Sequence, residues 1–287
     1  MSQLTRVAIT QMRCDWDVES NLAKAESLVR AAAAKGAQIV LLQELFATPY
    51  FCPKQKAAYF DYAAPASAHP FIPRFAAVAK ELNIVCPISF FERVENAYFN
   101  SMMMIDADGS LLGLYRKSHL PQGPGYEEKF YFSPGDTGFK VWDTAAGRIG
   151  VGICWDQWFP ECARAMALMG ADLLLYPTAI GSEPENPQIN SKDHWQRTMQ
   201  GHAAANMVAL AASNRIGQEV IDDITMHFYG HSFIADATGG KLAELNADEG
   251  LAVADFDFAA MRTERASWGL FRDRRVDLYD GLTRLYG

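Results

Sequence analysis

Three residues that could carry out chemistry each follow an apolar run of the sequence. They are Glu44 after 38–43, Lys117 after 111–116 and Cys154 after 149–153. Sites in layered α/β proteins gather at the carboxyl ends of strands, so we expect the three side chains to meet. Glu44 could take the thiol proton of Cys154, pass it to a leaving amine and then activate water. Lys117 and a backbone N–H near Trp155 could hold the resulting oxyanion.

Each of these residues, taken alone, has an ordinary structural explanation. A free thiol is usually buried as a small hydrophobic group. Glu44 and Lys117 could form a structural ion pair, because an unpaired charge at the edge of an apolar core is costly. Together, however, the three residues form a consistent catalytic set, since a cysteine needs a base or a positive neighbour to react at neutral pH.

The segment around Cys154 has the pattern of a strand followed by a helix. Ile149, Val151 and Ile153 alternate with glycines, as in a short buried strand. The stretch 160–170 begins with proline and ends with glycine, which is typical of a helix. We therefore expect Cys154 at the tip of a strand, beside N–H groups that are not part of a sheet.

Other catalytic classes leave no signature in the chain. It contains no GxSxG, HExxH, Walker A or GxGxxG motif, and its six histidines show no metal-ligand spacing. We therefore expect no metal and no cofactor. His202 and His231 are interpreted as polar structural residues.

Composition indicates an ordinary globular protein. Of the 287 residues, 49% are hydrophobic and 21% charged, and the net charge of −8 argues against nucleic-acid binding. Five cysteines without a CxxC pair suit a reducing compartment. No secretory signal is visible, and the alanine run 31–34 is too short to span a membrane, so we expect a cytoplasmic protein without membrane contact.

Helical and strand patterns alternate along the whole chain. Helices are expected at 18–35, 72–82, 160–170 and 191–206, and strands at 7–12, 38–43, 84–92, 99–106, 111–116, 172–176, 208–213, 231–236 and 251–256. An ordered loop is expected at 119–138. This alternation predicts a single α/β domain over residues 1–287. The aromatic segment from about 260 to 287 is expected to pack on a neighbouring subunit of a homo-oligomer.

The three residues stand in motifs that resemble the nitrilase superfamily of carbon–nitrogen hydrolases, whose triad is Glu, Lys and Cys. Glu44 ends Leu-Leu-Gln-Glu, Lys117 ends Tyr-Arg-Lys, and Cys154 lies in Gly-Ile-Cys-Trp-Asp. The resemblance implies a four-layer αββα sandwich and oligomers formed through the helix after Cys154 and the C-terminal segment. It also implies a second glutamate that braces the lysine, which is Glu128, or Glu127 if the register slips.

Longer motifs resemble one group within this superfamily, the N-carbamoylputrescine amidases. The matching stretches are 121–126, 154–161, 176–184 and 267–275. Glu127 departs from the glutamine expected there. The resemblance implies hydrolysis of N-carbamoylputrescine to putrescine, carbon dioxide and ammonia through a covalent cysteine intermediate, the last step of a route from agmatine to polyamines. Asn214, in another matching segment, is interpreted as a structural support that could reach the site.

Such a cationic ureido substrate needs an anionic receptor for its amine. Glu183 is the first candidate and Glu185 the second, with Tyr50, Tyr126 and Trp155 as walls for the alkyl chain. An N-carbamoyl amino-acid or β-ureidopropionate hydrolase would instead present Arg or His to a carboxylate. A nitrilase, or a non-catalytic assembly protein of the same fold, are further alternatives.

Overall fold

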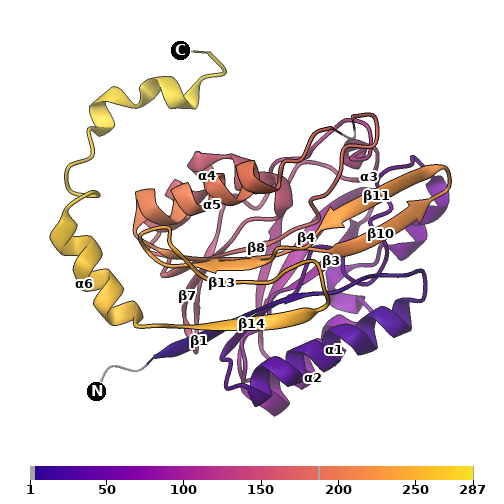
Figure 1. Cartoon of the computed structure of the whole chain (residues 1–287), viewed down its shortest axis with the longest axis horizontal. Coiled ribbons are helices and arrows are strands. Elements are labelled where there is room, and N and C mark those ends of the chain that lie inside the picture. The colour runs from indigo at the N-terminus through magenta and orange to yellow at the C-terminus, as the bar shows by residue number, and fades with distance from the viewer. Residues whose placement is uncertain (1–3, 187, 287) are drawn as a thin grey trace.

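The computed structural model describes residues 4–186 and 188–286. Two β-sheets pack face to face, with helices α1 and α2 on the outside of one and α4 and α5 on the outside of the other (Figure 1). This arrangement is the expected four-layer αββα sandwich. The helices span α1 Val18–Ala34, α2 Ile72–Leu82, α4 Pro160–Leu168 and α5 Lys192–Asn206.

The first sheet contains the strands that lead to Glu44 and Lys117. Strand β1 pairs antiparallel with β14 and parallel with β2. Val85 bridges β2 at Ile39 and leads to the β3–β4–β5 meander. The strands are β1 Thr5–Gln11, β2 Ile39–Leu41, β3 Ile88–Val94, β4 Ala97–Ile105, β5 Leu111–Arg116 and β14 Gly250–Phe256.

The second sheet contains the strand that leads to Cys154. Its order is β13-β12-β9-β8-β7-β6, and β7, β8 and β9 run parallel. The strands are β6 Val141–Thr144, β7 Gly147–Val151, β8 Leu173–Pro177, β9 Ala209–Ser213, β12 Phe233–Ala235 and β13 Lys241–Glu244. A separate hairpin, β10 Ile216–Ile221 and β11 Ile224–Tyr229, leaves this sheet after β9.

Apolar side chains fill each of the three spaces between the layers. Val7, Ile9 and Leu41 of the first sheet pack against Ile149 and Leu173 of the second. Two outer clusters join α1 and α2 to the first sheet and α4 and α5 to the second. Strands buried on both faces account for the nearly continuous apolar runs in the sequence.

Some expected elements differ in extent. The strand expected at 84–92 begins only at Ile88. In the stretch before it, Val85 pairs with β2 at Ile39 and Cys86 donates its N–H to Ile105 of β4, so this stretch passes from one strand to the other and pairs along neither. The strand expected at 231–236 shortens to Phe233–Ala235, because His231 adopts a φ of +53°. The loop 119–138 contains a one-turn helix, α3 Glu128–Tyr131. Hairpin β10–β11 and helix α6, Phe258–Trp268, were not expected individually.

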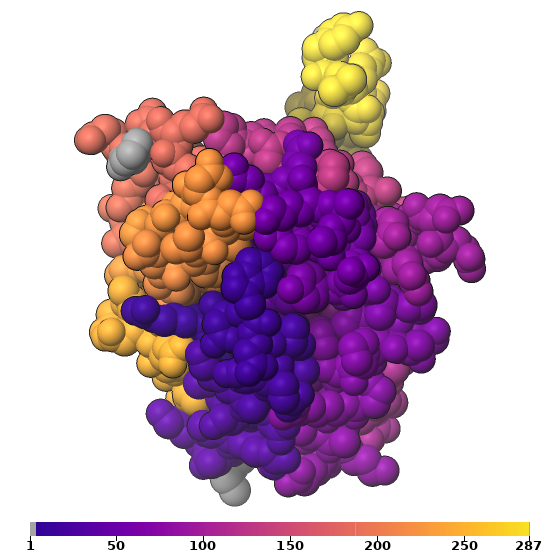
Figure 2. Space-filling view, turned by 90° about the vertical axis from the view of Figure 1, so that its right-hand side faces the viewer, coloured from indigo at the N-terminus to yellow at the C-terminus, as the bar shows by residue number. Residues whose placement is uncertain are grey.

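The C-terminal segment runs away from the sandwich after α6 (Figures 1 and 2). Its apolar side chains are left open to solvent: Trp268 is 68% exposed, Leu282 67% and Tyr286 85%. Within the described residues, no helix is long and apolar enough to cross a membrane.

Candidate active site

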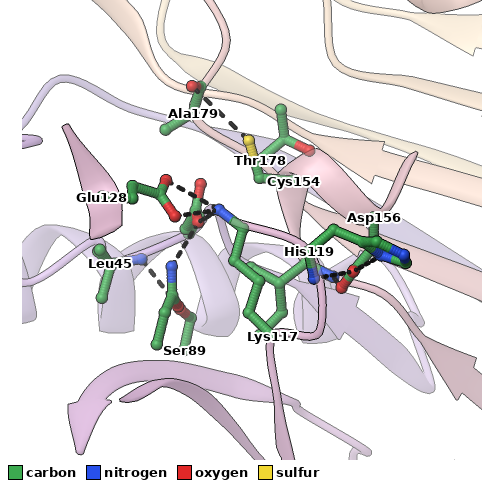
Figure 3. Close-up of polar contacts among 12 residues, drawn as sticks. Leu45, Ser89, Lys117, His119, Glu128, Cys154, Asp156, Thr178 and Ala179 are labelled. Atoms are coloured by element: carbon green, nitrogen blue, oxygen red, sulfur yellow. Dashed lines mark hydrogen bonds and ion pairs between the residues drawn. The ribbon is translucent and has the colours of Figure 1, made fainter. Parts of the chain in front are cut away.

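The fold brings Glu44, Lys117, Glu128 and Cys154 together from four separate segments. The Lys117 Nζ lies 2.9 Å from Glu44 Oε1 and 2.8 and 2.7 Å from the two oxygens of Glu128. Figure 3 shows the amine of Lys117 directed at Glu128, and the Cys154 side chain lies near that amine. The two carboxylates and the amine are all completely buried.

The cluster carries one positive group against two carboxylates. Burial raises the pKa of Glu128 to about 7, and the nearby Glu44 adds to the rise while Lys117 opposes it. Burial alone would lower the pKa of Lys117, but Glu128 and Glu44 outweigh it and raise that pKa well above its usual range. The two glutamates therefore favour the charged form of Lys117, whose amine contacts both of them.

Glu44 has one oxygen engaged and one open. Its Oε1 accepts hydrogen bonds from Lys117 Nζ and from Asn100 Nδ2, the latter at 2.6 Å. Its Oε2 is buried and has no hydrogen-bond partner among the described residues. A buried carboxylate oxygen without a donor is costly, so it is available to take a proton from a thiol or from water.

Cys154 stands at a sharp turn between β7 and the 3₁₀ helix Cys154–Trp158. Its φ is +43°, in the left-handed region that non-glycine residues rarely adopt. The turn packs closely, since a Cβ on Gly152 would come within 2.7 Å of Tyr176. The Sγ lies 3.9 Å from the Ala179 carbonyl oxygen. This geometry presents the thiol at the end of the strand, as expected from the sequence.

The surroundings of Cys154 favour the neutral thiol over the thiolate. Burial raises the pKa of Cys154 well above its usual range, Glu44 adds to the rise, and Lys117 partly offsets it. A thiol of this kind reacts only if a base removes its proton during attack. Glu44, whose charge acts on the thiol and whose Oε2 has no hydrogen-bond partner among the described residues, is the candidate for that base.

Asp156 fixes the turn that follows Cys154. Its Oδ2 accepts from the Ile153 N–H at 2.9 Å and the Tyr115 hydroxyl at 2.7 Å, and its Oδ1 accepts from the His119 N–H at 3.0 Å. The first hydrogen bond of the 3₁₀ turn runs from Asp156 N to Ile153 O, so the Trp155 N–H precedes it. Because it precedes the first bond of the turn, this N–H has no partner within the turn.

A cavity of about 270 Å³ opens in front of Cys154. Its lining includes three of the expected substrate-binding residues, Tyr126, Trp155 and Glu183, together with His194. Glu183 is the only Asp or Glu among the described lining residues, and burial raises its pKa. Glu185 faces a different surface depression, next to Glu127.

Two expected residues lie elsewhere than in the cavity wall. Tyr50 is fully buried and donates its hydroxyl to Glu128 at 2.6 Å, which favours a supporting role over contact with an alkyl chain. Asn214 uses its amide to bind the backbone of Ile180 and Gly230, so it supports the loop and does not reach into the cavity. Glu127 contacts Gln55 and Gln122, which confirms the register that assigns Glu128 to Lys117.

The histidines interpreted as structural are bound to other groups. His202 contacts the Gln157 carbonyl at 2.8 Å, and His231 contacts Glu244 at 3.1 Å. Among residues 4–186 and 188–286, no group of three His, Cys, Asp or Glu side chains could hold a metal ion.

The sequence interpretation missed two residues in direct contact with the cluster or the turn. Asn100 donates to Glu44, and Asp156 binds the turn after Cys154. Asn100, together with Ser101, interrupts the apolar run of strand β4, and this polar interruption could have indicated a residue of the site. Asp156 stands two residues after Cys154, where an acidic side chain can cap a turn.

The sequence and the fold match those of carbon–nitrogen hydrolases. Residues 6–266 match the family described as carbon–nitrogen hydrolase. The chain is 56% identical to the N-carbamoylputrescine amidase of Solanum tuberosum, over 100% of this chain and 97% of that protein. It is also 56% identical to the citrullinase of Francisella tularensis subsp. tularensis, over 98% and 99%.

A solved structure gives the same assignment. A variant of the amidase from Nesterenkonia sp. AN1, with the acetamide moiety of fluoroacetamide covalently added at its active-site cysteine, is 27% identical with a TM-score of 0.78. The match covers 96% of this chain and 95% of that one. The chain belongs to the carbon–nitrogen hydrolase family and is an amide-hydrolysing enzyme.

Proposed function

We propose that the protein hydrolyses N-carbamoylputrescine to putrescine, carbon dioxide and ammonia, as in polyamine formation from agmatine. The observation that carries the proposal is a single cavity lined by Cys154 and by the carboxylate of Glu183. A ureido group at the thiol and a terminal amine at the carboxylate match these two features. The similarity to the Solanum tuberosum amidase supports the same substrate.

In this mechanism Cys154 is the nucleophile and Glu44 the general base. Glu44 Oε2 takes the thiol proton as Sγ attacks the ureido carbon, and it then gives that proton to the nitrogen that leaves. The remaining S-carbamoyl group is attacked by water, which Glu44 deprotonates, and the C–S bond breaks. The product is a carbamic acid, which loses carbon dioxide and releases the second nitrogen as an amine or ammonia. One water is consumed in total.

The oxyanion is stabilised by the Trp155 N–H and by the charge of Lys117. A ureido carbon is a poor electrophile, so this stabilisation matters in a buried site; one donor of this kind is typically worth about 3 kcal/mol. All three Lys117 protons are directed at Glu44 and Glu128, and Glu128 keeps the amine in position. The acetamide group carried by the Nesterenkonia cysteine supports a nucleophilic role for the matching thiol, Cys154, here.

The charge of the cavity favours a cationic substrate. Glu183 is acidic, and the described lining contains no Arg or Lys; His194 is its one residue of the Arg or His kind that a carboxylate-binding hydrolase would need. Tyr126 and Trp155 provide aromatic walls for the four-carbon chain. The citrullinase similarity introduces a related ureido compound, citrulline, which carries a carboxylate in addition to its amine.

A substrate panel tests the proposal. Ammonia release would be measured with the purified protein on N-carbamoylputrescine, citrulline, N-carbamoyl-β-alanine and a simple aliphatic nitrile. We expect the highest kcat/KM on N-carbamoylputrescine. A preference for N-carbamoyl-β-alanine, which has a carboxylate and no amine, would reject Glu183 as the determinant of specificity. A preference for citrulline would reject N-carbamoylputrescine as the substrate, a preference for the nitrile would make the protein a nitrilase, and turnover of none of them would reject all four substrates.

We also propose that the chain forms one domain whose C-terminal segment, about 260–287, packs on a second copy. Support comes from the large apolar side chains that this segment leaves exposed. We expect a second copy of the same chain to cover these exposed side chains.

A further inference from the structure

Arg215 is a fully buried arginine outside the catalytic cluster. It follows strand β9 and precedes the hairpin β10–β11, and its side chain is 0% exposed. Its Nη2 donates to the carbonyl oxygens of Glu44 at 3.0 Å and Leu45 at 2.6 Å, and its Nη1 donates to the Thr48 carbonyl at 2.9 Å. One guanidinium thus binds three backbone carbonyls of the segment that carries Glu44.

That segment has a conformation that needs such support. Leu45, directly after Glu44, has a φ of +47°, which is unfavourable for a leucine. Its N–H donates to Ser89 Oγ at 3.0 Å (Figure 3). The peptide group between Glu44 and Leu45 is therefore bound at both ends, at its carbonyl by Arg215 and at its N–H by Ser89. These two bonds keep the left-handed turn, which directs the Glu44 side chain towards Lys117.

Glu219 extends the same support to the second carboxylate. Its Oε1 accepts from Arg215 at 2.8 Å, and its Oε2 accepts from the Tyr50 N–H at 2.6 Å. Tyr50 in turn donates its hydroxyl to Glu128. The buried Arg215–Glu219 pair is therefore connected to Glu44 through the backbone and to Glu128 through Tyr50.

Stability alone does not explain a buried pair of charges. Desolvation largely offsets the attraction between such charges, and apolar side chains of similar volume are often at least as stable. A requirement for geometry does explain it, because a planar guanidinium can hold several carbonyls at fixed positions.

We propose that Arg215, paired with Glu219, is a positioning residue that sets the place of the general base Glu44 and, through Tyr50, of Glu128. Neither residue touches the substrate. The inference rests on the proposed role of Glu44, and it predicts that loosening the pair slows the chemical step without weakening substrate binding.

The test uses two variants and one matched control in the full-length protein. Arg215→Lys keeps the charge next to Glu219 but cannot reach all three carbonyls, and Glu219→Gln removes the charge while keeping the shape. Arg74→Lys is the control, because Arg74 forms a comparable guanidinium pair with Glu26 and Glu19 on the outer helices. For each protein, kcat and KM for N-carbamoylputrescine and the melting temperature would be measured.

A second readout needs no substrate. The rate at which iodoacetamide alkylates Cys154 in the folded protein would be followed by peptide mass spectrometry, because this rate depends on Glu44 accepting the thiol proton. A merely structural role would lower the melting temperature and leave the rate per folded molecule unchanged.

We expect Arg215→Lys to lower kcat by about 10- to 100-fold with KM within about twofold, and to slow Cys154 alkylation by about tenfold. Glu219→Gln should act in the same direction, and Arg74→Lys should change neither rate. If Arg215→Lys does not fold, Glu219→Gln decides. Unchanged kcat and alkylation in the folded variant overturn the inference. Slower alkylation in a protein whose wild type does not hydrolyse N-carbamoylputrescine would reject the proposed substrate and keep the positioning role.

Discussion

Asp156 and His119 are joined twice, through the His119 backbone N–H at 3.0 Å and through its ring Nδ1 at 2.7 Å from the same carboxylate oxygen. His119 comes two residues after Lys117, and Asp156 two residues after Cys154. The His119 ring also stacks on Phe159, with centroids 3.7 Å apart. The loop that carries Lys117 and the turn that carries Cys154 are therefore held together by one buried carboxylate.

Asp156→Asn should loosen this junction. The amide NH₂ would face donors that now point at a carboxylate, so we expect a loss of about 1–3 kcal/mol in the free energy of unfolding, measured with urea. Activity per folded molecule should fall about tenfold or more, because the turn at Cys154 shifts. Asp143→Asn, at a carboxylate with 82% side-chain exposure, is the control and should change stability by less than about 0.5 kcal/mol.

Cys154→Ala should abolish ammonia release while the fold remains. Loss of a nucleophile of this kind typically costs on the order of 10⁶ in kcat, and residual activity would come only from binding and oxyanion stabilisation. The control is Cys86→Ala, at a thiol buried in the core beneath α1 and α2. Loss of activity in both variants would point to a defect of folding rather than of catalysis.

Tyr50→Phe should shift the pH dependence of kcat/KM. The Tyr50 hydrogen bond holds down the pKa of Glu128, which burial raises to about 7. Without that bond the pKa of Glu128 rises further. Glu128 then becomes neutral at a higher pH and no longer compensates the positive charge of Lys117. We expect the acid limb of the profile to move up by about one pH unit. Tyr62→Phe, outside the cluster, should leave the limb in place.

Glu183→Gln should weaken substrate binding more than turnover. We expect KM for N-carbamoylputrescine to rise about tenfold or more with a smaller change in kcat, because the amine loses its anionic partner. In the wild type, KM should also rise towards acid pH, since burial raises the pKa of Glu183 and the protonated carboxyl no longer attracts a cation. Glu185→Gln is the matched control; an equal effect there would dismiss Glu183 as the receptor.

The exposed C-terminal side chains predict an oligomer. We expect light scattering to give a molar mass above the 31.8 kDa of one chain. The double variant Val276→Glu with Leu282→Glu should reduce it, because charges would be buried in the contact. Leu111→Glu, at an exposed leucine on the sandwich itself, should leave the mass unchanged. A wild-type protein that is monomeric would contradict the packing proposed for residues 260–287.

The order of elements and the core of the site could be predicted because they depend on local patterns. The apolar runs before Glu44, Lys117 and Cys154 form buried strands, and the charges at their ends cannot remain unpaired in a core. Helix ends were marked by Pro160 and Gly170. These signals lie within a few residues of one another in the sequence.

What could not be predicted depends on contacts between distant segments. Tyr50 reads as a possible cavity wall, and only the fold shows its hydroxyl pointing at Glu128. Arg215 binds carbonyls about 170 positions earlier in the chain, and backbone carbonyls carry no sequence signal. The hairpin β10–β11 was missed because its exposed and buried residues alternate too weakly to stand out from a loop.

Glu44 and Lys117 leave the first sheet, whereas Cys154 leaves the second. In an unfolded chain none of the five cysteines has both Glu44 and Lys117 beside it. Selectivity for one thiol arises only when the two halves of the sandwich have closed on each other. An electrophile that modifies Cys154 alone would therefore count correctly assembled molecules during folding, independently of any substrate.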